Sequence, residues 1–226
     1  MRKSIKVIIV VTLAILAFML GYLLTGHYEA SDTALSYTIT QEQSDYITYD
    51  NNSQTGFIFY PGAKVDSKAY GYLSELDANV YVAKFPFEMA MMDSDIAETI
   101  MSDNPEVENW YIGGHSLGGV FANRYAIENM DKIDGVVFLG SYPVSSAESI
   151  LPSIALFGDQ DLIVGDYTEK LGQFTDVAEI IVLDNANHSG FGDYGQQQGD
   201  AELTDEQLDQ QRETILSEIN EFINKN

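Results

Sequence analysis

Short apolar runs alternate with helix-like segments along most of the chain, and this alternation limits the folds that are open to it. The runs that we expect to form strands cover residues 46–49, 55–60, 80–85, 110–113, 135–140, 154–157 and 179–183. Most are short and continuously apolar, as strands buried on both faces of a parallel sheet should be. The pattern therefore predicts an α/β fold, in which a mostly parallel sheet carries helices on both faces.

Helix signals fall between the apolar runs. Asp66 can cap a helix that runs to about Leu76, and residues 93–101 are amphipathic before Pro105. Three further helices are expected at residues 117–129, 167–174 and 204–223. The last begins with Thr-x-x-Gln and has one apolar stripe, formed by Leu208, Ile215, Ile219 and Phe222. We find no internal repeat, and the 226 residues suit a single folded domain, expected at residues 45–226.

The amino-terminal residues predict a membrane segment. Basic residues at positions 2, 3 and 6 precede an uncharged stretch whose dense apolar part, residues 7–24, is long enough to cross the hydrocarbon core. All 35 acidic residues follow it, and the basic residues before it should stay in the cytoplasm, so the domain should face outward. We expect residues 1–29 to anchor the protein and residues 30–44 to be a polar spacer; a cleaved signal peptide and a secreted product are the alternative.

Composition excludes several classes of function. A formal net charge of -24 repels phosphate backbones, so nucleic acid is not expected as a partner, and solubility explains the acidity better than a specific cationic ligand. The absence of cysteine excludes disulfides, thiolate metal sites and a cysteine nucleophile. Acidic residues and histidines form no ligand cluster in the sequence, so neither a metal nor an organic cofactor is implied.

The chemistry is expected at Gly114-x-Ser116-x-Gly118, which lies between a predicted strand and a predicted helix. A strained turn in this setting raises the serine hydroxyl above the sheet, and side chains at the two glycine positions would clash with crowded backbone. The amino terminus of the following helix also favours developing negative charge. Ser116 is therefore the candidate nucleophile.

A serine at its ordinary pKa needs a base, and the sequence offers three histidines. His27 lies at the membrane boundary, and His115 is adjacent to Ser116, so its side chain should leave the strand end in a different direction. His188 follows the last predicted strand in a loop and remains as the candidate base.

The carboxylate that orients the base should lie between Ser116 and His188 in sequence. Asp161 is the first choice because it lies further into the loop after residues 154–157, whereas Asp159 is expected to bond local backbone amides. Asp184 is a third alternative, since it shares a short loop with the histidine.

Acyl transfer also requires two backbone N–H donors for the oxyanion, one of them from the residue after the nucleophile, Leu117. The second should come from the loop that follows residues 55–60. Pro61 has no N–H and Gly62 lets the chain turn, so Ala63 is the expected donor, with Gly62 as the alternative.

Several motifs resemble the small bacterial α/β hydrolases grouped as alpha/beta hydrolase fold-5. They are Gly-His-Ser-Leu-Gly-Gly, Gly-Asp-Gln-Asp, Phe-Tyr-Pro-Gly-Ala-Lys-Val, Lys-Phe-Pro-Phe and His-Ser-Gly-Phe-Gly-Asp-Tyr-Gly-Gln-Gln-Gln-Gly-Asp, the last at residues 188–200. The resemblance covers roughly residue 55 to the carboxyl end and implies an α/β-hydrolase fold, a triad matching Ser116, Asp161 and His188, and often an amino-terminal membrane segment. The sequence departs from the wider superfamily at Tyr60-Pro61-Gly62, where many relatives carry His-Gly.

These residues predict a carboxylesterase-like serine hydrolase that forms an acyl-enzyme. Only residues 141–153 separate two predicted strands at the place where caps are usually inserted, so the site should be open, without a large cap. Tyr142, Phe87 and residues 89–92 either line the acyl side or belong to the core or rim. An acyltransferase acting on cell-envelope substrates and a catalytically silent surface binding protein are the alternative functions.

Overall fold

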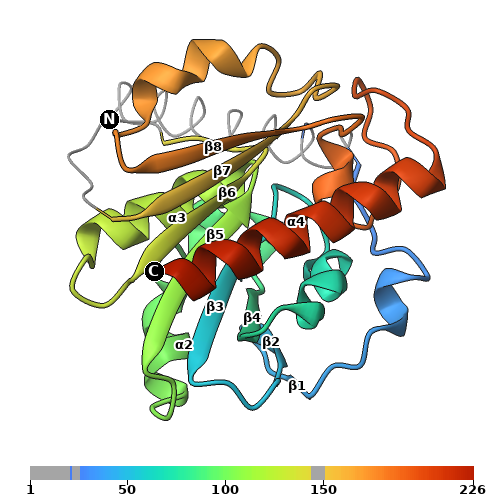
Figure 1. The fold of residues 1–226 in the computed structure, drawn as a ribbon. Coiled ribbons are helices and arrows are strands. Elements are labelled where there is room, and N and C mark those ends of the chain that lie inside the picture. Colours follow the sequence, from blue (N-terminus) through green and yellow to red (C-terminus); the bar gives the residue numbers. More distant parts are fainter. Residues whose placement is uncertain (1–20, 22–25, 144–150) are drawn as a thin grey trace, which may run out of the picture.

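A computed structural model describes Gly21, residues 26–143 and residues 151–226. Within these residues one eight-stranded sheet has the order β1-β2-β4-β3-β5-β6-β7-β8 (Figure 1). The strands are β1 (Gln41–Glu42), β2 (Tyr46–Tyr49), β3 (Thr55–Tyr60), β4 (Asn79–Ala83), β5 (Asn109–His115), β6 (Gly135–Leu139), β7 (Ser153–Gly158) and β8 (Ala178–Leu183). β2 is antiparallel to β1 and β4, and the pairs from β4 to β8 are parallel. The predicted mostly parallel sheet is confirmed.

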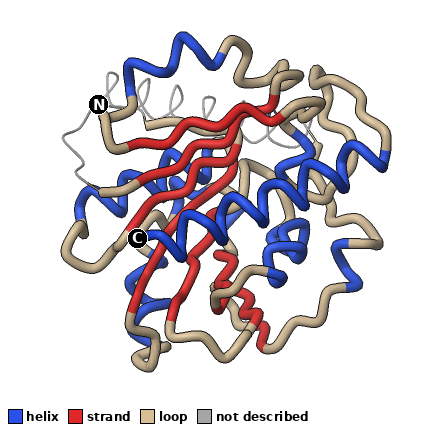
Figure 2. The backbone as a smooth tube through the Cα atoms, viewed as in Figure 1, coloured by secondary structure: helices blue, strands red, loops and turns tan. Residues whose placement is uncertain are grey.

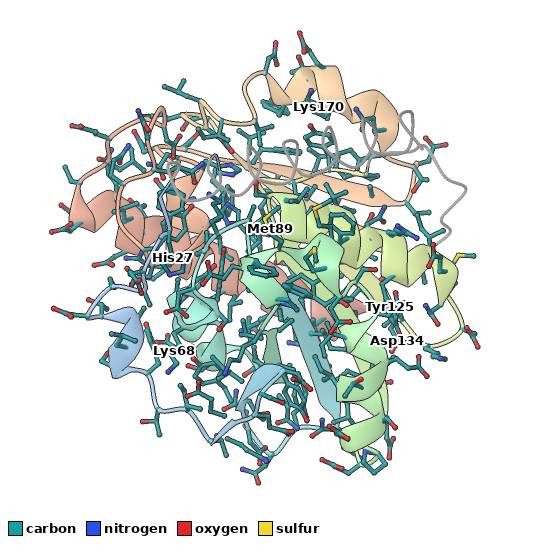
Figure 3. The ribbon with its side chains drawn as sticks, turned by 180° about the vertical axis from the view of Figure 1, so that it is seen from behind. His27, Lys68, Met89, Tyr125, Asp134 and Lys170 are labelled. Atoms are coloured by element: carbon teal, nitrogen blue, oxygen red, sulfur yellow. The ribbon has the colours of Figure 1, made fainter. Side chains whose placement is uncertain are left out.

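Helices cover both faces of the sheet (Figures 1 and 2). The α-helices are α2 (Ile96–Asp103), α3 (Leu117–Glu128) and α4 (Asp205–Lys225), and the 3-10 helices are η1 (Ala34–Ser36), η2 (Ser67–Glu75), η3 (Pro86–Glu88), η4 (Ala90–Met92), η5 (Tyr167–Gln173) and η6 (Ser189–Phe191). α4 and η2 share one buried cluster with the sheet, and α2 and α3 share the other. Figure 3, seen from behind, shows the face that α2 and α3 cover.

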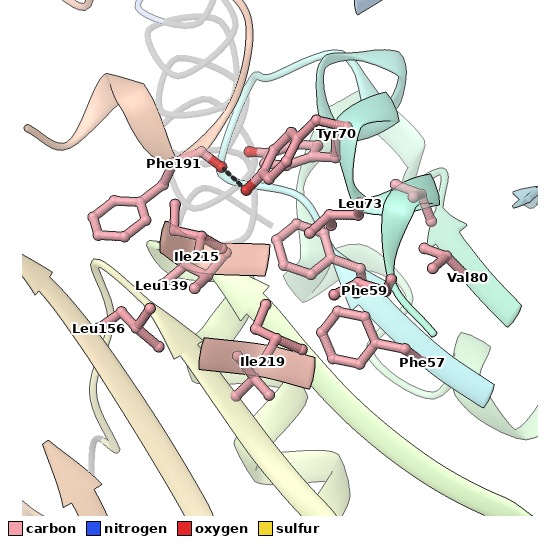
Figure 4. Close-up of a cluster of buried hydrophobic side chains, with 14 of the residues drawn as sticks. Phe57, Phe59, Tyr70, Leu73, Val80, Leu139, Leu156, Phe191, Ile215 and Ile219 are labelled. Carbon is pink, nitrogen blue, oxygen red and sulfur yellow. Dashed lines mark hydrogen bonds between the residues drawn. The ribbon is translucent and has the colours of Figure 1, made fainter. Parts of the chain in front are cut away.

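The core on the α4 side is built from fully buried aromatic and branched side chains. Phe57 and Phe59 of β3 meet Ile215 and Ile219 of α4 in this cluster (Figure 4), and all four have no measurable exposure. These positions follow from the two periodicities, since alternate residues of a strand share a face and residues four apart share a helix stripe. This burial fixes the position of α4 on the sheet. It therefore also fixes the side chains of α4 that contact the loop between β8 and α4.

Most predicted boundaries agree with the observed ones to within a few residues. The capping box of α4 is confirmed, because Thr204 and Gln207 each accept the backbone N–H of the other. Two predicted helices, η2 and η5, are 3-10 helices. In η2 the backbone is kinked at Tyr70, and a Cβ on Gly71 would lie 2.9 Å from the Ala34 carbonyl oxygen, so close packing and a glycine interrupt a regular helix.

The stretch that we predict to be a polar spacer, residues 30–44, packs on the domain in the structure. Just before it, Tyr28 forms a β-bridge with Val65, and the Ser31 N–H donates to the Asp193 carbonyl oxygen at 2.9 Å. Ala34 is buried, and β1 adds an edge strand that we did not predict. The domain therefore includes packed chain ahead of residue 45.

The predicted membrane segment, residues 7–24, lies outside the described residues apart from Gly21. Among the residues that the structure does describe, no helix is both long enough and apolar enough to cross a bilayer.

Candidate active site

Ser116 occupies the turn between β5 and α3, as predicted, with φ 52° and ψ -124°. Such a conformation costs a non-glycine residue about 1–3 kcal/mol, and the surrounding structure must hold it. Its N–H donates to the Leu139 carbonyl oxygen of β6 at 3.0 Å, and the Ser141 hydroxyl donates to the Ser116 carbonyl oxygen at 2.7 Å. Although serine is a preferred helix cap, the Ser116 side chain makes no capping hydrogen bond to α3. The hydroxyl is therefore not used by the helix that it begins.

Two glycines allow the close packing around this turn. A Cβ on Gly114 would lie 2.6 Å from backbone atoms of Gly118 and Gly119, and one on Gly118 would overlap the carbonyl oxygens of Tyr60 and Pro61. The predicted need for glycine at both positions is thus visible in the backbone contacts. Gly118 also brings the loop after β3 directly against the first turn of α3.

His188 and Asp161 form a buried pair. The distance from His188 Nδ1 to Asp161 Oδ2 is 2.7 Å, and the exposed fractions of the two residues are 1% and 5%. The other carboxylate oxygen of Asp161 accepts the N–H groups of Ile163 and Val164 at 2.9 and 2.8 Å. Both oxygens of the carboxylate are therefore oriented, one by the backbone and one toward the imidazole.

The loop that carries His188 is held on both sides of the histidine. Gln211 of α4 donates from Nε2 to the Asn187 carbonyl oxygen at 2.9 Å and accepts the Asn187 N–H at 3.2 Å. Asp200 accepts both the N–H and the hydroxyl of Ser189, at 2.8 and 2.9 Å. The same Asp200 accepts the Leu162 N–H at 3.2 Å, which ties the loop of the histidine to the loop of Asp161.

Ser116 and His188 lie at the same edge of the sheet, on either side of the end of β6. The serine N–H is bonded to Leu139, the last residue of β6. A Cβ on the next residue, Gly140, would lie 3.0 Å from His188 Nδ1. The structure thus brings the three predicted residues to one place where parallel strands end, the usual location of a site in open α/β sheets.

The loop after β3 holds one amide for which the described residues offer no acceptor. Gly62 N–H donates to the Tyr70 hydroxyl at 2.9 Å, Lys64 N–H to the Glu88 carbonyl oxygen at 3.0 Å, and Val65 N–H to the Gly62 carbonyl oxygen at 3.2 Å. Within the described part of the chain, the Ala63 N–H has no such partner. The hydrogen bonds of the loop therefore favour Ala63 over Gly62 as a free donor.

His115 lies beside the candidate base. Its side chain is expected to leave the strand end in a different direction from that of Ser116; in the structure its ring is buried, with its centroid 4.6 Å from that of His188. Its Nδ1 lies 2.9 Å from the Tyr70 hydroxyl. Burial holds the pKa of His115 well below its usual value, and the charge of His188 lowers this pKa further. The His188 backbone acts in the opposite direction and raises it, but its effect is the smallest of the three. His115 is therefore a neutral neighbour of the candidate base. Its contacts with Gly62 and Tyr70 could not be predicted from any pattern in the sequence.

The alternative acids and histidine lie outside this arrangement. Asp159 is exposed and accepts the Ala186 N–H at 3.1 Å, as expected for a residue that bonds local backbone, and Asp184 is also exposed. His27 forms ion pairs with Glu29 and Glu88 at the surface. Their positions leave Asp161 and His188 as the paired groups.

The candidate acyl-lining residues are mostly at the surface. Phe87, Met91 and Met92 have exposed fractions of 66%, 56% and 55%. Tyr142 and Met89 are half-buried, and Met89 is labelled in Figure 3. Their exposure excludes the buried core as the place of Phe87, Met91 and Met92.

Comparison with known proteins places the chain in a family and includes a short sequence match. A model of the Alpha/beta hydrolase family matches residues 56–212, more than half of the chain. A 61-residue segment is 39% identical to the pimeloyl-[acyl-carrier protein] methyl ester esterase of Photorhabdus laumondii subsp. laumondii. That segment covers 27% of this chain and 23% of the esterase, so the match spans under a quarter of the relative's length.

Solved structures share the fold at low sequence identity. The monoacylglycerol lipase of Paleococcus ferrophilus aligns with a TM-score of 0.59 and 15% identity, over 78% of this chain and 98% of the lipase. A serine hydrolase without a lid from Xanthomonas campestris aligns with a TM-score of 0.56 and 13% identity, over 80% and 88% of the two chains. The family match, the sheet order and the serine turn agree, and the chain belongs to the alpha/beta hydrolase family.

Proposed function

We propose that the protein is a serine hydrolase that cleaves carboxyl esters through an acyl-enzyme. The observation that carries the proposal is the buried 2.7 Å contact between His188 and Asp161 at the sheet edge where Ser116 is held in a strained turn. A buried carboxylate facing Nδ1 keeps the proton on that nitrogen, so Nε2 is free to accept a proton. The hydroxyl of Ser116 makes no cap to α3 and is available as the nucleophile.

In the proposed acylation, His188 Nε2 takes the Ser116 proton as the serine oxygen attacks the ester carbonyl carbon. The carbonyl oxygen becomes an oxyanion, which accepts the N–H groups of Leu117 and Ala63. Collapse of this intermediate breaks the bond to the alcohol, which leaves with the proton from His188. Water then attacks the acyl-enzyme with His188 again accepting a proton, and the acid is released as Ser116 recovers its proton.

Small or surface-presented esters suit this site best. β6 ends at Leu139 and β7 begins at Ser153, a connection too short for a large cap. The short match to a methyl ester esterase supports an ester substrate. Exposed Phe87, Met91 and Met92 can contact the acyl or alcohol part at the rim.

A fluorophosphonate probe tests the proposed nucleophile on the full chain in detergent. We expect one covalent adduct per chain, mapped by mass spectrometry of a digest to the peptide containing Ser116, together with turnover of p-nitrophenyl acetate. Preincubation with the probe should remove the turnover in proportion to labelling. A folded protein that neither labels nor turns over esters of any acyl length would favour the silent binding protein instead.

We further propose that residues 1–29 anchor the protein in the cell membrane with the hydrolase domain outside the cytoplasm. The apolar run at residues 7–24 and the basic residues before it support this topology. The full chain should remain in membranes after an alkaline carbonate wash, and protease added to intact spheroplasts should digest the domain. A shortened chain recovered from the medium, with a new amino terminus after residue 24, would instead show cleavage and secretion.

A further inference from the structure

Tyr70 links the candidate oxyanion loop to the residue before the nucleophile. Its hydroxyl accepts the Gly62 N–H at 2.9 Å and lies 2.9 Å from His115 Nδ1. The ring packs in the core against Phe59, with centroids 4.7 Å apart (Figure 4). Both Tyr70 and His115 are buried, so these polar contacts form away from water. Burial raises the pKa of Tyr70 well above its usual value, and the phenol stays protonated.

The hydrogen-bond partners assign the protons of this pair. The phenol proton needs an acceptor, and His115 Nδ1 is the acceptor within reach once the oxygen has accepted from Gly62. Neutral His115 therefore carries its own proton on Nε2, which has no hydrogen-bond partner among the described residues. The Tyr70 hydroxyl holds the loop of Ala63 through the Gly62 N–H, and the ring of His115 lies against the ring of His188.

We propose that Tyr70 and His115 are positioning residues that hold the second oxyanion donor, Ala63, and the ring of His188 in place. The inference rests on the serine hydrolase function proposed above. A Cβ on Gly62 would lie 2.8 Å from His115 Nδ1, so the loop rests directly on the histidine. Gly62 is the neighbour of Ala63, and a shift of the loop moves the Ala63 N–H away from the oxyanion. Neither side chain exchanges a proton with the substrate.

Kinetics of Tyr70→Phe and His115→Phe test the pair in the full chain. Each variant should lower kcat by about 10- to 100-fold with KM changed by less than about twofold. The reason is that the hydrogen bond from the displaced donor to the oxyanion acts mainly in the transition state. The inhibition constant of a trifluoromethyl ketone, whose adduct with Ser116 places an oxyanion at the donors, should rise by the same factor as kcat falls. His115→Asn puts an amide oxygen near the place of Nδ1 and should restore part of the loss.

A double variant and a matched control separate positioning from general damage. Tyr70→Phe with His115→Phe should lose no more activity than the worse single variant, because both remove the same link. Tyr111→Phe removes another buried hydroxyl, which donates to the Ile223 carbonyl oxygen at 3.3 Å far from the site, and should keep wild-type kcat. Additive losses in the double variant, an unchanged inhibition constant of the trifluoromethyl ketone, or wild-type kcat in Tyr70→Phe would each overturn this inference and leave the proposed function standing. Absence of esterase activity in the wild-type protein would overturn the proposed function and with it this inference.

Discussion

Replacing Ser116 by Ala should lower kcat for ester hydrolysis by about 10⁶-fold, as expected when the nucleophile of such a site is removed. The free energy of unfolding should change by less than about 0.5 kcal/mol, because the hydroxyl makes no cap to α3 and the residue is partly exposed. The strain at φ 52° is the same for Ala as for Ser, so it does not alter the comparison. Stopped-flow or long-incubation assays with p-nitrophenyl acetate and urea unfolding measure the two quantities.

Ser36→Ala is the matched control for this substitution. Its exposed hydroxyl donates to the Thr33 carbonyl oxygen at 2.6 Å in η1, away from the sheet edge. It should keep both labelling by the fluorophosphonate and wild-type turnover. Residual activity in Ser116→Ala within about tenfold of the wild type would contradict the assignment of the nucleophile.

Replacing Asp161 by Asn should lower kcat by about 10⁴-fold with the fold preserved. The structure gives a specific reason. Ile163 and Val164 donate to Oδ1, so the amide oxygen of an Asn would take that place and its NH₂ would face His188 Nδ1. Nδ1 would then have to accept, the imidazole proton would move to Nε2, and the base could no longer take the serine proton.

Asp159→Asn tests whether this loss belongs to one carboxylate of the loop. Asp159 is exposed, and its carboxylate accepts the Ala186 N–H, a bond that an amide oxygen can also accept. Its kcat should stay within about twofold of wild type, and both variants should give the wild-type circular dichroism spectrum. Turnover near the wild-type value in Asp161→Asn would remove that residue from the proposed triad.

Local patterns in the sequence predict the fold and the meeting of the candidate site residues at one edge of the sheet. The strands are continuous apolar runs, so seven of the eight were predicted close to their observed positions, and the Thr204 capping box marked the start of α4. Gly114 and Gly118 predict a crowded turn, because a Cβ atom at either position would clash with backbone atoms. Asp161 and His188 are separated by 27 residues, yet each follows a strand of a parallel sheet, and strand ends meet at one edge.

Features that depend on contacts between distant segments could not be predicted. Strand β1 has two residues, and the contacts of residues 28–36 with Val65, Gly71 and Asp193 have no local signal. The same holds for His115, whose position beside Ser116 says nothing of Tyr70, 45 residues away, with which it shares a hydrogen bond. The switch from α to 3-10 geometry in η2 likewise depends on close packing around Gly71.

The bond between Gln211 and Asn187 has a consequence for how the enzyme is made. The loop of His188 is held by a helix that begins at Asp205 and is fixed by Ile215, Ile219 and Phe222, near the end of the chain. β5 and Ser116 are synthesised before α4. A nascent chain that has not yet formed α4 therefore holds Ser116 while the loop of His188 lacks its two hydrogen bonds to Gln211. The candidate base is fixed in place only when α4 has packed on the sheet.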